Sequence, residues 1–170
     1  NKLSFTLVAT AGGLLPRSAT VTDALVTGRP GTLDATFGAA QTGLARVSFG
    51  ADDNGGFYDL DVVGGQIVAA GQGFGGLGGI SFAVTRLTSS GAVDPGFAMG
   101  TLVKSRFGTG SGASSSAVAV GHQLSGRIIA MGWHEIPNPA DIALQRYGVN
   151  GSIGDPFFGL SGKSLLDLGG

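Results

Sequence analysis

The sequence predicts an all-β protein built from short antiparallel strands, and three observations support this. A turn motif, in which a glycine is followed by an aliphatic residue and then a phenylalanine, begins at Gly31, Gly91 and Gly151, which are evenly spaced. Glycine contributes 33 of the 170 residues, which suits many tight turns better than long helices. Between the motifs, apolar and polar residues alternate with the period of a half-buried strand.

Residues 1–30 are expected to form the second half of a repeat, because residues 7–11 align with residues 67–71 when the chain is shifted by one motif spacing. Lys2 and the apolar residues after it could also be the hydrophobic part of a signal peptide. This apolar run is too short to span a bilayer, and we interpret it as a strand.

Residues 31–90 are predicted to be one complete repeat. After the turn motif, strands are expected over residues 44–49, 58–62, 66–70 and 82–87. The pair Gly64-Gly65 indicates a two-residue hairpin. Residues 50–56 and the glycine-rich run 71–79 are expected to be loops.

Residues 91–150 are predicted to repeat this order, with strands over residues 102–107, 116–120, 127–132 and 142–147. The connections at 121–125 and 133–139 are longer than those of the first copy. Residues 151–170 begin a further repeat, with a strand over 164–168. A third blade could be assembled from this segment and residues 1–30, and 1–170 is predicted to be a single repeat domain. Three blades are fewer than the four to eight of a usual propeller. The chain could therefore be part of a larger propeller, several copies could assemble, or the units could stack openly, and we favour assembly of several copies.

Four short antiparallel strands per ~60-residue unit favour propeller-type blades over a β-sandwich. A sheet of this size cannot bury its own apolar faces, so each unit must stack on its neighbours.

Several stretches match a known family. They are the motif Gly-x-Leu-Asp-x-x-Phe-Gly at 31–38, the strand ending in Phe49-Gly50, and residues 64–71 and 82–87. Together they resemble the bacterial delta-60 repeat family. The resemblance implies β-propeller-like blades in secreted or cell-surface proteins, and it supplies no catalytic residues. The chain departs from the pattern at Val26 and Gly154, where other copies carry Arg and Asp.

The phenylalanines of the turn motif, Phe37, Phe97 and Phe157, recur at the same constant spacing as the glycines that begin it. We expect them to fill positions between blades or at blade corners. Each would then contribute about 2–3 kcal/mol by burial.

Arginine and aspartate also recur together around the turn motif. Asp34 and Asp94 occupy the same motif position, Arg86 precedes Asp94, and Arg146 precedes Asp155. Our hypothesis is that each Arg binds a turn-motif Asp, or carbonyl groups of the turn, by charge-assisted hydrogen bonds.

Trp133, His134 and Glu135 are the only place where Trp, His and Glu cluster. In a connection between strands, they could bind a sugar or anchor a partner protein. Alternatively, the Trp folds back over the blade edge. The second histidine, His122, lies in the other long connection, and two His with one Glu do not make a zinc site without a further ligand.

Asp52-Asp53-Asn54-Gly55 is rich in oxygen atoms like a calcium loop, but it lacks the spacing of an EF-hand. We expect a solvated turn and no cofactor. The glycines of 71–76 lead into no predicted helix, so they lack the mechanism of a phosphate-binding loop.

The charge balance, 10 basic against 11 acidic residues, creates no field that would attract nucleic acid. Without cysteine, disulfides and thiolate chemistry are excluded. Glu135 is the only glutamate, and this scarcity of acid–base groups disfavours catalysis.

The sequence therefore favours a non-catalytic extracytoplasmic module that is secreted, periplasmic or on the cell surface, without a transmembrane segment. It would bind protein or glycan, or associate with itself through blade edges. The alternative is a propeller-type carbohydrate-active enzyme, which would need a pocket with converging carboxylates.

Overall fold

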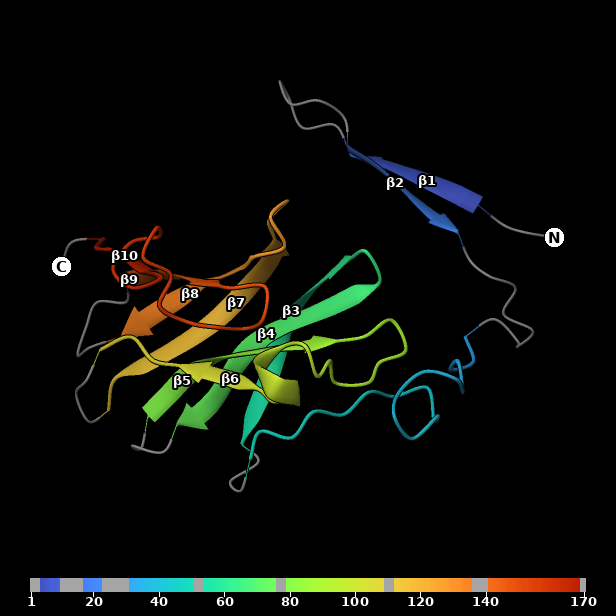
Figure 1. Cartoon of the computed structure of the whole chain (residues 1–170), viewed down its shortest axis with the longest axis horizontal. Coiled ribbons are helices and arrows are strands. Elements are labelled where there is room, and N and C mark those ends of the chain that lie inside the picture. Colours follow the sequence, from blue (N-terminus) through green and yellow to red (C-terminus); the bar gives the residue numbers. More distant parts are fainter. Residues whose placement is uncertain are drawn as a thin grey trace.

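The computed structural model describes residues 4–9, 17–22, 31–50, 54–75, 79–108, 112–135 and 141–168. Over these ranges the protein is all-β, with two four-stranded antiparallel sheets and one two-stranded sheet (Figure 1). Their only helical element is the short 3-10 turn η1 (Ala98–Gly100). None of the described residues form a helix with the length and apolar character needed to cross a bilayer. The predicted fold class, all-β with four-stranded antiparallel sheets, is confirmed.

The first sheet has the strand order β3-β4-β5-β6. Its strands are β3 (Gly55–Val63), β4 (Gln66–Gly75), β5 (Gly79–Leu87) and β6 (Val103–Ser105). Gly64 and Gly65 connect β3 to β4, and both have positive φ, as the predicted two-residue hairpin requires. The loop expected from residue 71 onward is wrong in its first part, because β4 keeps pairing with β3 through Gly73 and with β5 through Gly75.

The second sheet has the order β10-β9-β8-β7. Its strands are β7 (Ser114–His122), β8 (Ile128–Glu135), β9 (Asp141–Tyr147) and β10 (Lys163–Leu166). Strands were predicted at all four places, but two expected connections were too long. His122 belongs to β7, and Trp133 to Glu135 belong to β8, because pairing between β7 and β8 continues from His122↔Ile128 to Ser114↔Glu135.

The N-terminal hairpin differs from the expected half repeat. It consists of β1 (Ser4–Ala9) and β2 (Arg17–Thr22), and Figure 1 shows it apart from both four-stranded sheets. In the alignment by one motif spacing, Leu7 corresponds to Ile67, which pairs with Leu87. The alignment therefore predicts residue 27 as the partner of Leu7, but Leu7 pairs with Ala19, eight residues earlier. In the described ranges the chain ends do not pair with each other, since β1 and β2 pair with one another and β10 pairs with β9. Residues 23–30 lie outside those ranges.

Residues 44–49 were predicted to be a strand, but they form no ladder with another described strand. The equivalent stretch, 102–107, contains β6, which pairs with β5. A ladder needs a neighbouring strand. Among the described strands, none pairs with residues 44–49 as β5 pairs with β6. Residues 44–47 of this segment border the cleft described below.

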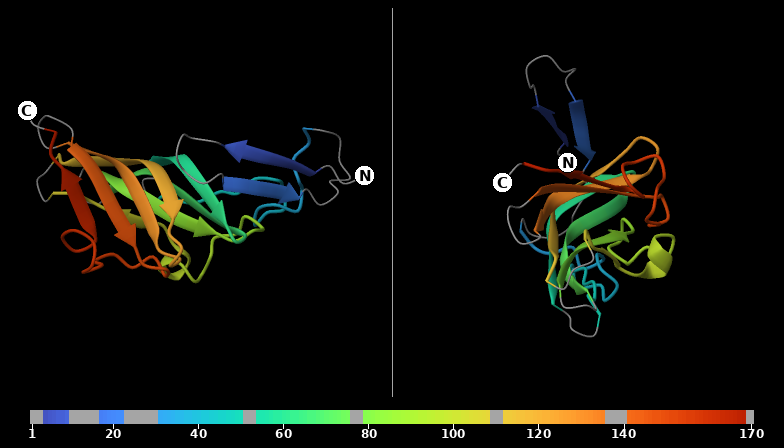
Figure 2. Two further views of the ribbon diagram at one scale, coloured as in Figure 1. Left: turned by 90° about the horizontal axis from the view of Figure 1, so that it is seen from above. Right: turned by 90° about the vertical axis from the view of Figure 1, so that its left-hand side faces the viewer.

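The two four-stranded sheets pack face to face around one buried cluster (Figure 2). We call the two sides that meet here the contact faces. The cluster comprises Val68, Ala70, Phe82, Val84, Phe97, Phe107, Ala117, Ile128, Ala130, Ala143 and Tyr147. Phe107 packs against Phe82 with the rings tilted and their centroids 5.1 Å apart. Burial of these side chains holds the two sheets together.

The two sheets contain β-bulges at matching places. The ladder between β3 and β4 shifts register between Phe57 and Asp59, and the ladder between β7 and β8 shifts between Ala117 and Ala119. We call residues at matching positions of the two ladders counterparts. Gly71 and Gly132 are such counterparts, and a Cβ on either would lie under 2 Å from a carbonyl oxygen of the neighbouring strand. The bulge therefore requires glycine at this position.

Replacing Gly132 by Ala is expected to lower the free energy of unfolding by about 2 kcal/mol, because the new methyl group overlaps the Ser116 carbonyl. Urea denaturation followed by circular dichroism measures this loss. Gly121→Ala on β7 is the matched control, since nothing lies within 4 Å of a Cβ there. Equal stability of the two variants would contradict the tight fit at the bulge.

Candidate functional site

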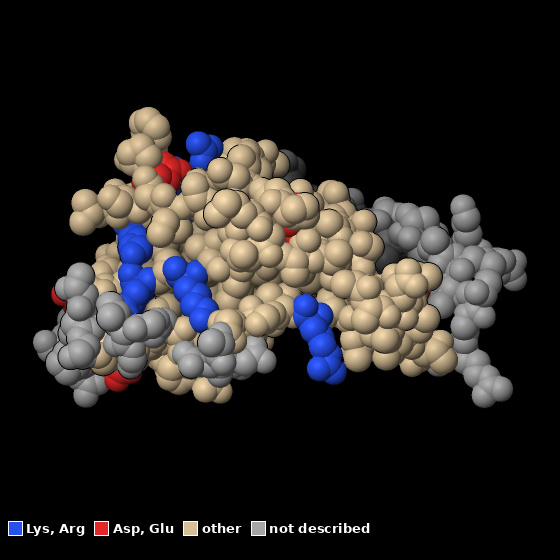
Figure 3. Space-filling model, turned by 60° about the horizontal axis from the view of Figure 1, so that its bottom comes forward, with Lys and Arg blue, Asp and Glu red and all other residues tan. Residues whose placement is uncertain are grey.

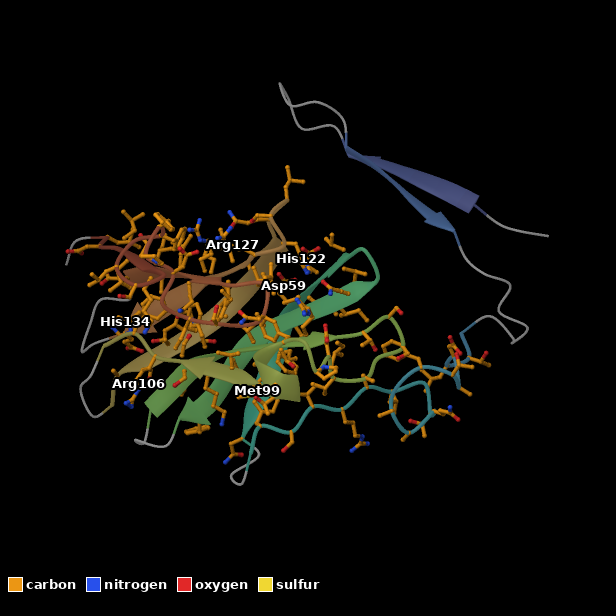
Figure 4. All side chains as sticks on the ribbon, viewed as in Figure 1. Asp59, Met99, Arg106, His122, Arg127 and His134 are labelled. Atoms are coloured by element: carbon orange, nitrogen blue, oxygen red, sulfur yellow. The ribbon has the colours of Figure 1, made fainter. Side chains whose placement is uncertain are left out.

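The predicted binding residues Trp133, His134 and Glu135 are the last three of β8 and alternate between the two sides of the sheet. His134 is buried on the contact face, with Nδ1 2.9 Å from the Ser115 hydroxyl. Its ring lies 5.9 Å from that of Phe107, and Figure 4 shows it among the packed strands. The structure therefore separates His134 from Trp133 and Glu135, which lie on the opposite side.

The turn-motif phenylalanines do not share one environment. Phe97 is fully buried, and Phe37 is half-buried with its ring against Gly91. Phe157, however, is 85% exposed, so the prediction that it fills a buried position between blades or at a blade corner is wrong.

Phe158 takes the place that was assigned to Phe157. Its N–H donates to the Asp155 carbonyl, as the Phe97 N–H donates to Asp94. The Arg146 guanidinium lies 4.9 Å from the centre of the Phe158 ring, and Arg86 lies 5.1 Å from that of Phe97. The third motif thus contains one extra residue before its aspartate.

The expected Arg–Asp bonds are present. Arg86 Nε lies 2.7 Å from Asp94 Oδ2, and its Nη1 donates to the Val149 carbonyl at 2.7 Å. Arg86 therefore joins two successive turn motifs. In the next motif, Arg146 Nε lies 2.9 Å from Asp155 Oδ2. The bond from Arg146 and the backbone N–H of Phe157 hold the pKa of Asp155 below its usual value.

Asp34 has a different partner. Its Oδ1 accepts hydrogen bonds from the Thr36 hydroxyl at 2.6 Å and the Thr36 N–H at 2.9 Å. These bonds lower the pKa of Asp34. The aspartate closes its own turn, as expected of an Asx turn.

Two aspartates that sequence reasoning did not single out connect the sheets. Asp59 Oδ2 accepts the Val120 N–H at 2.8 Å. Asp61 Oδ2 accepts the His122 N–H at 2.8 Å and lies 3.0 Å from His122 Nδ1. Figure 4 shows Asp59 and His122 close together on β3 and β7. Burial raises the pKa of Asp61, but the bonds from His122 outweigh this and leave it lowered.

The first sheet carries a cleft of about 820 Å³ on the side away from the second sheet. We call it the cleft. Its floor is made by Leu60, Ile67, Ala69, Thr85 and Leu87, and residues 43–47 form one wall. The lining is mostly apolar. Thr85 is fully buried there, and its hydroxyl has no hydrogen-bond partner among the described residues, which is unusual for a buried polar group.

The second sheet carries an apolar surface on the side away from the first sheet. We call it the outer face, and it consists of Ile129, Met131, Trp133, Ile142, Leu144 and Leu166. Cross-strand pairs share one side of a sheet, and Met131↔Leu144 and Trp133↔Ile142↔Leu166 are such sets. Charged side chains are sparse on the described part of the face shown in Figure 3.

Within the described ranges, no group of three His, Asp or Glu side chains could hold a metal ion. Asp52 and Asp53 of the expected solvated turn lie outside those ranges. Comparison with protein-family models, curated proteins and solved structures found no match. The function is therefore inferred from the cleft, the outer face and the bonds between the sheets.

Proposed function

We propose that this protein is a non-catalytic, extracytoplasmic structural module made of propeller-type blades, which assembles with protein partners through its sheet faces. Each four-stranded sheet is one blade of the repeat. The resemblance to delta-60 repeats supports the extracytoplasmic location, and the sparse surface charge is consistent with a chain that covers its surface by association.

The main support is the match between the outer face and a buried surface. Val68, Ala70, Phe82 and Val84 on the first sheet are fully buried by the second sheet. Their counterparts on the second sheet are Ile129, Met131, Ile142 and Leu144, which belong to the outer face. These positions are apolar in both sheets. On the first sheet they are covered by the second sheet, whereas no sheet of the described residues covers the outer face. Exposed apolar surfaces of this kind mark binding sites for other proteins.

The roles of the carboxylates support a structural function over an enzymatic one. Asp59 and Asp61 accept backbone N–H groups of β7, and Asp94 and Asp155 pair with arginines. Glycoside hydrolysis needs two free carboxyl groups facing one pocket. Among the residues that the structure describes, Asp59 is the only acidic one that lines the cleft.

The simplest partner is a second copy, docked outer face to outer face as a two-fold sandwich. Light scattering and native mass spectrometry over a range of concentrations should show a dimer that dissociates on dilution. Met131→Asp places a charge on the outer face and should leave the chain monomeric.

Met99→Asp is the matched control, because Met99 is exposed on a turn away from the outer face. It should associate like the wild type. A wild-type chain that stays monomeric at all concentrations would refute the proposal, as would a Met131→Asp variant that still dimerises.

A further inference from the structure

The second turn motif packs against the turn that leads into the third motif. The residue after Phe97 donates its backbone N–H to the Asn150 carbonyl at 2.8 Å, and Arg86 Nη1 donates to the Val149 carbonyl at 2.7 Å. The Phe97 ring covers Gly151, where a Cβ would lie 3.2 Å from Cε1 of the ring. The turn thus offers two successive carbonyl oxygens and then a glycine, and the motif before it supplies two donors and an aromatic ring.

The first turn motif makes the same kind of contact with the turn that leads into the second motif. The Gly38 N–H donates to the Ser90 carbonyl at 2.7 Å, and a Cβ on Gly91 would lie 2.7 Å from Cζ of the Phe37 ring. Gly91 and Gly151 have φ values of 79° and 80°. The contact is therefore a repeated interface within this chain, and the space and the backbone at its centre require glycine.

The third turn motif has the same donors and the same ring. Phe158 takes the place of Phe97, since the Arg146 guanidinium lies over its ring. Gly159 follows it with a positive φ, as Gly38 follows the ring of the first motif. A Cβ on either glycine would lie 1.9 Å from a carbonyl oxygen of the segment after the motif. The two glycines therefore hold the same backbone position.

These groups of the third motif contact no such turn within the described ranges. The Gly159 N–H has no acceptor there, and Arg146 uses only its Nε, in the bond to Asp155. Phe158 is half-buried, whereas the ring of the second motif is fully buried. Ile129 of the outer face is paired with Arg146 across the ladder, so these groups border the outer face.

We propose that Arg146, Phe158 and Gly159 form a docking site for a glycine turn of a protein partner. The first of two successive carbonyl oxygens in that turn accepts from an Arg146 Nη, and the second accepts from the Gly159 N–H. The glycine that follows lies under the Phe158 ring. This inference rests on the proposed function and deepens it, because a partner that packs over the outer face brings its turn to this site.

The site is fixed before the partner arrives. The Arg146 guanidinium is held by the bond from its Nε to Asp155 at 2.9 Å and lies 4.9 Å from the centre of the Phe158 ring. Little side-chain entropy is therefore lost when its remaining N–H groups bind a carbonyl. A hydrogen bond from a charged donor is also stronger than one between neutral groups. The site thus favours a turn with exposed carbonyl oxygens.

A cyclic peptide with the sequence of residues 147–152 is the probe for this site. In the chain, the Gly148 N–H donates to the Ser152 carbonyl at 2.9 Å, so cyclisation holds the turn in its shape. The peptide is added to the isotope-labelled protein, and NMR spectra follow the backbone N–H of Gly159. We expect a saturable downfield shift, because this N–H gains an acceptor. The Gly38 N–H is already bonded and should not shift.

Two substitutions test the contacts of the probe. Gly151→Ala in the peptide should weaken binding about tenfold, because the added methyl group overlaps the aromatic ring. Arg146→Lys in the protein keeps a positive charge beside Asp155 but removes the planar fork of donors. It should also weaken binding about tenfold. Arg127→Met is the matched control, since Arg127 contacts the same aspartate, and it should bind the peptide like the wild type.

A Gly159 N–H that does not shift at millimolar peptide would overturn the proposal. Equal binding of the glycine and alanine peptides would overturn it as well, as would shifts limited to the outer face, which indicate apolar adhesion without the turn. The titration is repeated on Met131→Asp, which should bind the peptide equally well without self-association. Failure of the docking site is therefore distinguishable from failure of the proposed assembly.

Discussion

Replacing Phe97 by Ala is expected to lower the free energy of unfolding by about 4 kcal/mol, the largest loss that we predict for a single truncation. Phe97 is fully buried in the cluster between the sheets. Its ring lies beneath the Arg86 guanidinium and against Gly151 of the next turn motif. Truncation leaves a cavity where two turn motifs and both sheets meet. Urea or thermal unfolding measures the loss.

Phe157→Ala is the control for this experiment. Phe157 was expected to play the same part, but it is 85% exposed, so its truncation should cost less than about 0.5 kcal/mol. Similar losses for the two variants would contradict the assignment of Phe158 as the residue of the third motif that packs against its arginine.

Replacing Arg86 by Met is expected to cost about 3 kcal/mol, because removing one partner of a buried pair leaves an uncompensated charge. The change removes the ion pair with Asp94 and the bond to the Val149 carbonyl. The Arg86 and Asp94 side chains are only 9% and 15% exposed. Thermal unfolding at neutral pH should show a clearly lowered midpoint.

Arg127→Met is the matched control, because Arg127 also lies near an aspartate, with Nε 3.2 Å from Asp155 Oδ2, but is 42% exposed. Exposed pairs contribute little, so this variant should lose at most about 0.5 kcal/mol. If Arg86→Met unfolded at the wild-type temperature, Arg86 would not hold successive turns together.

Local patterns predicted the strands well where each residue's environment repeats every second position. The alternation over residues 58–62 and 142–147 led to β3 and β9 because one side of each strand faces the contact between the sheets. The Arg–Asp bonds were also predictable, since both members of each pair lie close together in the sequence.

Features that depend on distant neighbours were not predictable in this way. Residues 133–135 were predicted to lie in a connection, but they continue β8 because β7 and β9 extend beside them. Residues 44–49 were predicted to be a strand, but they form no ladder with a described strand. The roles of Asp59 and Asp61 depend on β7, which lies far along the chain from β3.

The prediction for the third turn motif was wrong for a simpler reason. Extending the spacing of the first two motifs unchanged placed Phe157 where the structure has Phe158. The extra residue before Asp155 shifts the motif by one, and the bond from Arg146 to that aspartate identifies the true register.

The carboxylates of Asp59 and Asp61 bear on how this protein avoids aggregation. An edge strand with free N–H groups can recruit strands from other molecules and seed fibres. On β7, the N–H groups of Val120 and His122 are already occupied by these two side chains. This chain has few charges to repel other molecules. The carboxylates of Asp59 and Asp61 therefore protect the edge strand β7 from pairing with strands of other molecules.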